Sequence, residues 1–176
     1  MYNFDEEIDR YAGLSRKWLK YPKKDVIPLW IADMDFKTAP EIISAMQSAL
    51  NHGVFGYDSL QKVVTENLIS YLFKQYAWQT KPVDYMFMPG LVAGINLACR
   101  ALTAPDEAIL TATPIYPPFM SAPQFANRHL VTIPLIQLEG TWSWDFEKLE
   151  QLLADNSLNI KLLLLCNPHN PVGRAW

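Results

Sequence analysis

The stretch IKLLLLCNPHNPVGRAW, residues Ile160 to Trp176, decides the fold class. Its first half is an apolar run interrupted by a single lysine, which is typical of a strand buried on both faces of a parallel sheet. Two Asn-Pro pairs, a histidine, a glycine and an arginine follow it directly. Because a residue before proline is biased away from helix, we predict that the strand runs into a structured loop.

Short apolar runs alternate with helical patterns over the sequence upstream of this strand. Strands are predicted at residues 86–88, 109–113 and 129–136, and helices at 38–52, 60–76, 91–102, 117–128 and 144–155. Thr38 is the predicted N-cap of the first helix, and Gly53 stands where a C-terminal glycine belongs. The alternation predicts an α/β fold with a mainly parallel sheet and helices on both faces.

Composition and charge narrow the range of partners. The 176 residues carry a formal net charge of −3, and half of them are hydrophobic. A weakly acidic chain does not favour nucleic acid or an anionic membrane surface, and no apolar window approaches the ~20 residues of a membrane span. Cys99 and Cys166 are predicted to be buried small hydrophobes, and the histidines lack metal-ligand spacing. We expect a cytoplasmic protein without a metal site.

Three predicted strands end in unusual loops, and ligands of such sheets bind beyond the carboxyl ends of the strands. In PGLVAG, residues 89–94, Gly90 permits a tight turn before a helix whose first N–H groups can hold an anion such as phosphate. The alternative is an ordinary turn that opens a helix. The dinucleotide spacing G-x-G-x-x-G is absent from this loop.

The other two loops place an aromatic and an amide at the same edge. Tyr116 stands between prolines in TPIYPPF, residues 113–119, so a stiff backbone fixes the direction of its ring, which can stack on a flat cofactor. The alternative is a surface tyrosine on a stiff loop. Asn170, in NPHNPVGR, can donate its amide to an oxygen of a bound ring, and Gly173 permits a close turn. The alternative for this segment is a loop with two Asn-Pro turns and no function.

Together these motifs resemble a known family. NPHNPVGR, TPIYPPF and PGLVAG, with HGVFGY at 52–57 and PLWIADMDF at 28–36, are similar to the MalY/PatB group of pyridoxal-phosphate C–S β-lyases. This group belongs to the class I/II aminotransferase superfamily of fold type I, the aspartate aminotransferase-like fold. The similarity extends over essentially the whole chain.

The resemblance implies a role for each matching position. The backbone amides of Leu91 and Val92, after Gly90, would hold the phosphate of pyridoxal 5′-phosphate. Tyr116 would stack on its pyridine ring, and Asn170 would hydrogen-bond the 3′-oxygen of that ring.

Two further positions are assigned by the resemblance alone. Tyr57 would reach the phosphate in the neighbouring subunit of a homodimer, and Ala32 would offer a backbone contact to the substrate carboxylate. Residues 1–48 would contribute to the small domain, and residues 49–176 would form the first part of the large cofactor-binding domain.

The implied reaction is β-elimination of S-substituted cysteines, such as cystathionine to homocysteine, pyruvate and ammonia. The family's Schiff-base lysine lies beyond the Asn-Pro region, so we expect a truncated half-enzyme with no catalytic residue of its own, inactive alone. The lysines present are expected mostly on the surface. Two alternatives stay open, namely a class I/II aminotransferase and a non-enzymatic fragment or interaction piece.

Overall fold

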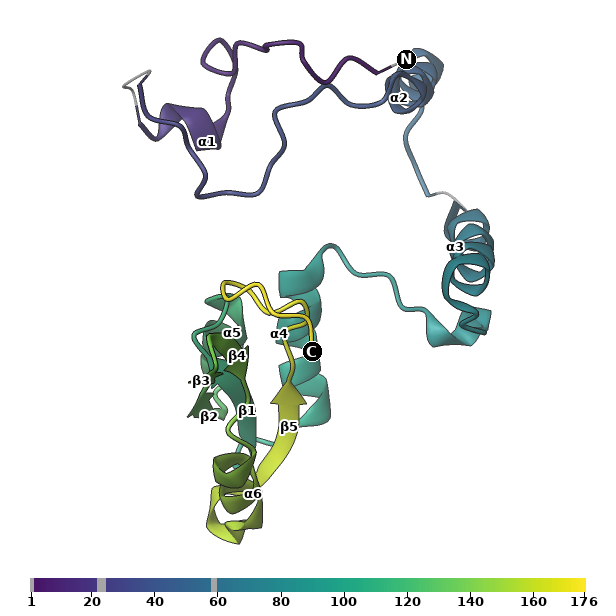
Figure 1. The fold of residues 1–176 in the computed structure, drawn as a ribbon. Coiled ribbons are helices and arrows are strands. Elements are labelled where there is room, and N and C mark those ends of the chain that lie inside the picture. The colour runs from purple at the N-terminus through teal and green to yellow at the C-terminus, as the bar shows by residue number, and fades with distance from the viewer. Residues whose placement is uncertain (1, 22–24, 58–59) are drawn as a thin grey trace. The chain divides into compact units, whose positions relative to one another are not determined.

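The structure, a computed structural model, describes residues 2–21, 25–57 and 60–176. These residues divide into two compact units, Met1–Glu66 and Asn67–Trp176, which can be followed along the chain in Figure 1. Helix α3 (Leu60–Tyr76) runs through the boundary between them, with the bounds predicted from its apolar spacing.

The first unit is largely irregular, and besides the start of α3 its described residues form two helices. The short helix α1 (Arg16–Leu19) was not predicted, and the Ser15 hydroxyl caps it by accepting a hydrogen bond from the Trp18 amide. Helix α2 (Pro40–His52) ends at Gly53, whose φ of 71° confirms the predicted glycine cap. The prediction of Thr38 as N-cap was wrong. The cap is Ala39, because Pro40 occupies the first helical position.

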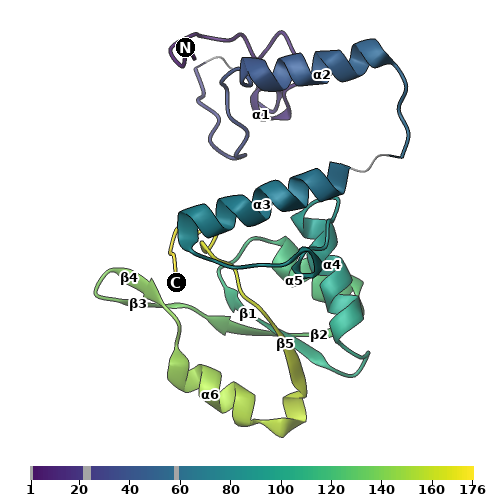
Figure 2. The ribbon, with the colours of Figure 1, turned by 90° about the vertical axis from the view of Figure 1, so that its right-hand side faces the viewer.

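The second unit is an α/β domain built on a small parallel sheet. Strand β1 (Ala108–Thr113) lies between β2 (His129–Pro134) and β5 (Ile160–Leu164) and is parallel to both, as predicted. A separate antiparallel hairpin follows β2, and Figure 2 shows it beside the sheet. The remaining elements are η1 (Pro82–Asp84), α4 (Leu91–Leu102), α5 (Pro118–Phe125), β3 (Ile136–Leu138), β4 (Thr141–Ser143), α6 (Phe146–Ala154) and η2 (Asn156–Leu158).

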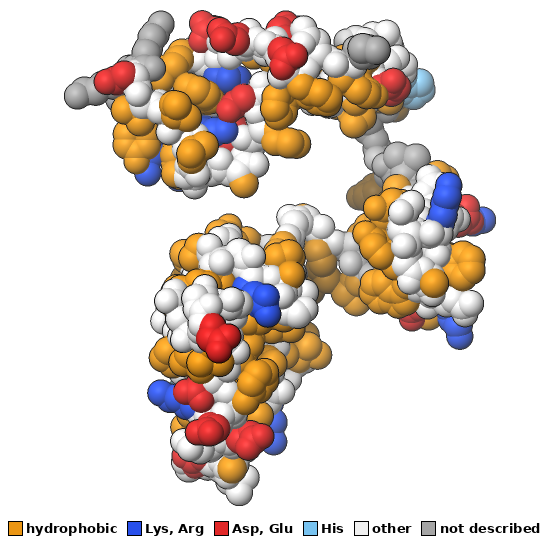
Figure 3. Space-filling view, in the orientation of Figure 1, with side chains coloured by type: hydrophobic (Ala, Val, Ile, Leu, Met, Phe, Trp, Pro, Cys, Tyr) orange, Lys and Arg blue, Asp and Glu red, His pale blue; other side chains and the backbone are white. Residues whose placement is uncertain are grey.

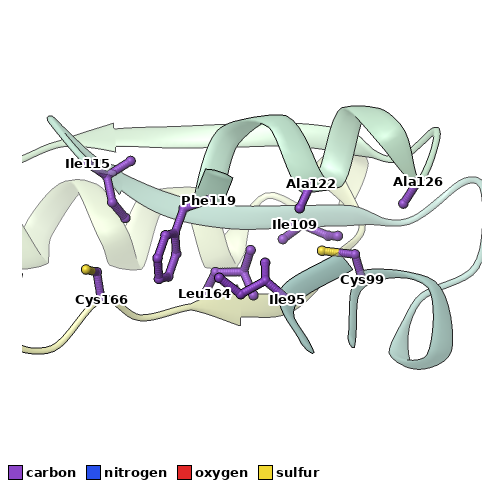
Figure 4. Packing of buried hydrophobic residues seen from close by; sticks show 9 residues of the cluster. All are labelled: Ile95, Cys99, Ile109, Ile115, Phe119, Ala122, Ala126, Leu164 and Cys166. Atoms are coloured by element: carbon purple, nitrogen blue, oxygen red, sulfur yellow. The ribbon is translucent and has the colours of Figure 1, made fainter. Parts of the chain in front are cut away.

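The sheet is covered on both faces, because consecutive residues of β1 point to opposite sides. Ile109 packs in a cluster with residues of α4 and α5, and Figure 4 shows Phe119, Leu164 and Ile95 pointing toward one another there. Leu110 belongs to a second cluster on the other face, with Trp144 and the apolar side of α6. The predicted α/β architecture with helices on both faces is confirmed.

Two strand predictions were wrong. Residues 86–88 form no strand, since none of the strands that the structure describes pairs with them, and Met86 is exposed. The predicted strand at 129–136 is divided: β2 ends at Pro134, and Ile136 begins the hairpin β3–β4. Glu139 and Gly140 turn this hairpin with positive φ angles of 50° and 76°.

The surface of each unit carries many apolar side chains, drawn in orange in Figure 3. In the second unit β5 is an edge strand, and Leu163 and Leu165 are about half exposed (46% and 50%). Among the helices of the described ranges, none combines the length and apolarity needed to cross a bilayer.

Candidate functional site

Two candidate loops of the second unit leave the sheet at the same edge. Strands β1 and β5 are parallel neighbours, with Thr111 opposite Leu164, so both carboxyl ends lie together. The buried Thr111 hydroxyl donates a 2.9 Å hydrogen bond to the Leu164 carbonyl and reinforces this register. Tyr116 follows β1 and Asn170 follows β5, and both are exposed. Topology therefore brings these two loops to one edge.

A histidine links the two loops directly. The Nε2 atom of His169 lies 2.9 Å from the backbone oxygen of Pro114, two residues before Tyr116. The His169 side chain is only 1% exposed, and its ring meets that of Trp176 edge to face, with centroids 5.5 Å apart. Sequence reasoning noted this histidine only for its lack of metal-ligand spacing. Its position between two Asn-Pro pairs was a signal, but its partner lies 55 residues away.

The loop that carries Asn170 is closed by its own backbone. The His169 amide donates to the Arg174 carbonyl, and the Gly173 amide donates to the His169 carbonyl, each at 2.7 Å. Gly173 has a φ of 73°, which confirms the predicted close turn. The backbone N–H of Asn170 also donates to the Cys166 sulfur at 3.4 Å. These bonds hold Asn170 in a defined turn just past the sheet.

Helix α4 begins at the same edge of the second unit. Figure 4 shows Ile95, near its start, beside Leu164 at the carboxyl end of β5, and Cys99 beside Ile109 near the beginning of β1. The helix therefore starts at the carboxyl edge of the sheet and runs away from it, and its start is the third feature at this edge.

The start of α4 offers free amide groups. The Gly94 amide makes the first intrahelical bond, to the Gly90 carbonyl at 3.1 Å, so the amides of Leu91 and Val92 precede the hydrogen-bonded turns. Gly90 is exposed and has a φ of 107°, and a Cβ added there would meet no atom within 4 Å. The helix start is thus open and rich in donors, which suits an anion such as a phosphate.

Ala32, a predicted substrate contact, belongs to the first unit and precedes a network of charges. The Arg10 guanidinium bonds the carboxylates of Asp33 and Asp35, both at 2.8 Å, and the Lys17 ammonium bonds Asp35 at 2.7 Å. The Trp18 indole donates to Asp35 at 2.8 Å. The bonds from Lys17 and Trp18 lower the pKa of Asp35. Sequence reasoning missed this network, which fixes the loop after Ala32.

Tyr57, also in the first unit, is fully exposed. Most of the lysines were expected on the surface, and Lys17 is an exception, because it is buried against Asp35. Lys62 is an exposed residue of α3, and its Nζ lies 4.0 Å from Oε1 of Glu66. Lys23 and Lys24 lie outside the described residues.

The sequence matches the family described as aminotransferase class I and II over residues 24–176. It is 35% identical to cystathionine β-lyase PatB of Bacillus subtilis, over 99% of this chain and 46% of that protein. It is 30% identical to protein MalY of Escherichia coli, over 100% of this chain and 46% of that protein.

Solved structures agree with the sequence relatives. OvoB superposes with a TM-score of 0.89 at 42% identity, over 99% of this chain and 45% of that one. Cystalysin from Treponema denticola, whose structure contains pyridoxal 5′-phosphate, gives 0.88 at 33% identity, over 100% of this chain and 46% of that one. The chain thus spans about half the length of these relatives. It is a member of the class I and II aminotransferase family, because the match to that family extends over residues 24–176.

Proposed function

We propose that the carboxyl edge of the second unit binds pyridoxal 5′-phosphate. The amides of Leu91 and Val92, after Gly90, hold the phosphate, where the partial positive charge of the helix start favours an anion. Tyr116 stacks on the pyridine ring, and Asn170 donates its side-chain amide to the 3′-oxygen. The observation that carries this proposal is the meeting of three loops at one edge, two of them joined through His169 and Pro114.

The residues at this edge fit such a cofactor by their chemistry. A phosphate requires several donors in an open setting, and the exposed Gly90 leaves the first amides of α4 accessible. A flat ring requires an aromatic face, and Tyr116 is partly exposed at 39% on a loop stiffened by prolines. When bound, the cofactor acts as an electron sink that stabilises a carbanion at the substrate's α-carbon. The contribution of this chain is to anchor and orient it.

For the whole protein we propose β-elimination of S-substituted cysteines, in which cystathionine gives homocysteine, pyruvate and ammonia. The similarity to PatB and MalY supports this activity. Ala32 contributes a backbone contact to the substrate carboxylate, and Tyr57 reaches the phosphate in the neighbouring subunit of a homodimer. Residues 1–48 belong to a small domain and residues 49–176 to the cofactor-binding domain.

Residues 1–176 alone are proposed to be inactive. All lysines of this chain precede the Asn170 loop, whereas the resemblance places the reactive lysine after it. The detection of pyruvate release by a purified 176-residue polypeptide would refute this part of the proposal.

An aminotransferase is the second candidate, because the matched family includes enzymes of that name. The two activities differ in their products, since a lyase releases a thiol and pyruvate while an aminotransferase converts a 2-oxo acid acceptor. The polypeptide expressed from the natural gene is incubated with cystathionine, with and without 2-oxo acids. We expect free thiol and pyruvate without an acceptor. Acceptor-dependent turnover without thiol would favour the aminotransferase, and no turnover of either kind would favour a non-enzymatic piece.

A further inference from the structure

We propose that His169 is a positioning residue that fixes the Asn170 loop against the Tyr116 loop, an inference that rests on the proposed cofactor site. Its imidazole forms a direct hydrogen bond between these two loops, whose bonded residues are 55 positions apart in sequence. His169 itself adjoins Asn170, and its partner Pro114 lies two residues before Tyr116. A displacement of this ring would shift the amide and the aromatic relative to each other.

The chemistry of the contact defines the state of the ring. The Pro114 oxygen is a carbonyl, which only accepts hydrogen bonds, so Nε2 must carry the proton and donate it. Nδ1 is buried and has no hydrogen-bond partner in the part of the chain that the structure describes. An unpaired buried polar atom lowers the stability of the folded protein, so an apolar ring at position 169 would give greater stability if packing were its only role. The use of histidine here is explained by its link to Pro114.

Hydrogen bonds and packing around the His169 ring couple its position to that of Asn170. Both backbone polar groups of His169 are bonded within the loop, and Trp176 closes one side of the ring. The Trp176 indole in turn donates to the Cys166 carbonyl at 3.0 Å, at the end of the sheet. Since the side chain is almost fully buried, it has little room to move. The turn that presents Asn170 therefore moves with the imidazole.

The test measures affinity for pyridoxine 5′-phosphate, which has the phosphate and ring of the cofactor but no aldehyde to react with lysines. The polypeptide expressed from its natural gene is compared with His169→Leu, which removes the donor, and His169→Gln, whose amide can replace Nε2. Loss of one buried hydrogen bond weakens binding about five- to tenfold for His169→Leu. His169→Gln stays within about twofold, as does His129→Leu, the control at an exposed histidine at the start of β2.

A double-substitution cycle separates positioning from general destabilisation. If His169 acts through Asn170, adding His169→Leu to Asn170→Ala changes the dissociation constant less than about twofold, and circular dichroism shows all variants folded. The inference is overturned if the losses of affinity from the two substitutions are independent and additive. It is also overturned if His169→Gln and His169→Leu weaken binding equally, or if His169→Leu leaves binding unchanged. Lack of binding by the unsubstituted protein overturns the cofactor site, and with it this role. Proton-nitrogen correlation spectra must also find the His169 proton on Nε2, and a proton only on Nδ1 refutes the link.

Discussion

Replacement of Gly90 by alanine tests how the start of helix α4 is built. Gly90 combines a φ of 107° with a ψ of 158°, a conformation that residues with a Cβ rarely adopt. A Cβ at this position meets no atom within 4 Å, so the penalty is backbone strain without a clash. Strain of this kind costs about 1–3 kcal/mol, which we expect as loss of stability in urea unfolding followed by circular dichroism.

The same substitution is expected to weaken anion binding if the chain relieves its strain by turning the first amides of α4. Interaction of an anion with a helix start contributes up to about 2 kcal/mol, so affinity for pyridoxine 5′-phosphate falls by up to about thirtyfold. Gly140→Ala is the matched control, because it strains a positive φ of 76° in the β3–β4 turn, outside the three loops of the proposed site. Gly90→Ala with the stability and affinity of the unsubstituted protein would refute the reasoning.

Three further predictions concern stability and solubility. Hydrogen bonds from Lys17 and Trp18 lower the pKa of Asp35 below its ordinary 3.8, so the stability that the Asp35 carboxylate contributes is present above pH 3.8 and is lost as the pH falls through the lower pKa of the folded protein. In an acid titration followed by tryptophan fluorescence, Asp35→Asn should lack this transition, and an unchanged transition would count against the prediction. Ile109→Ala, at a fully buried position, should cost about 2–5 kcal/mol in urea unfolding, and a cost below 1 kcal/mol would contradict the packing. Leu163→Lys, at a half-exposed position of the outer strand β5, should reduce light scattering of the 176-residue polypeptide at equal concentration, whereas equal scattering would show that this strand does not drive association.

The local sequence pattern was enough to predict an element where residues within that element determine its bounds. The spacing of apolar residues in 60–76 and 91–102 predicted α3 and α4 with the bounds observed, and Gly53 marked the end of α2. The apolar run after Lys161 predicted a strand of a parallel sheet, because both faces of β5 need covering. These features depend on residues close in sequence.

The misses involve partners distant in sequence or weak turn signals. Residues 86–88 have strand-like composition, but a strand exists only where another pairs with it. The β3–β4 hairpin was not predicted, because the apolar run at 129–136 was interpreted as one strand. The pair Glu139-Gly140 between two short segments was the available signal of a hairpin turn. The link from His169 to Pro114 and the network around Asp35 depend on tertiary packing, which spacing does not reveal.

We propose above all that one edge of the second unit holds a phosphorylated pyridine ring through Tyr116, Asn170 and the start of α4. Calorimetric titration with pyridoxine 5′-phosphate, against pyridoxine without the phosphate, tests it most directly. We predict saturable one-to-one binding that requires the phosphate and is weakened by Tyr116→Ala and by Asn170→Ala. The proposal would be contradicted if both variants bound pyridoxine 5′-phosphate as tightly as the unsubstituted protein. Equal affinity for pyridoxine, or no binding of pyridoxine 5′-phosphate at all, would contradict it as well.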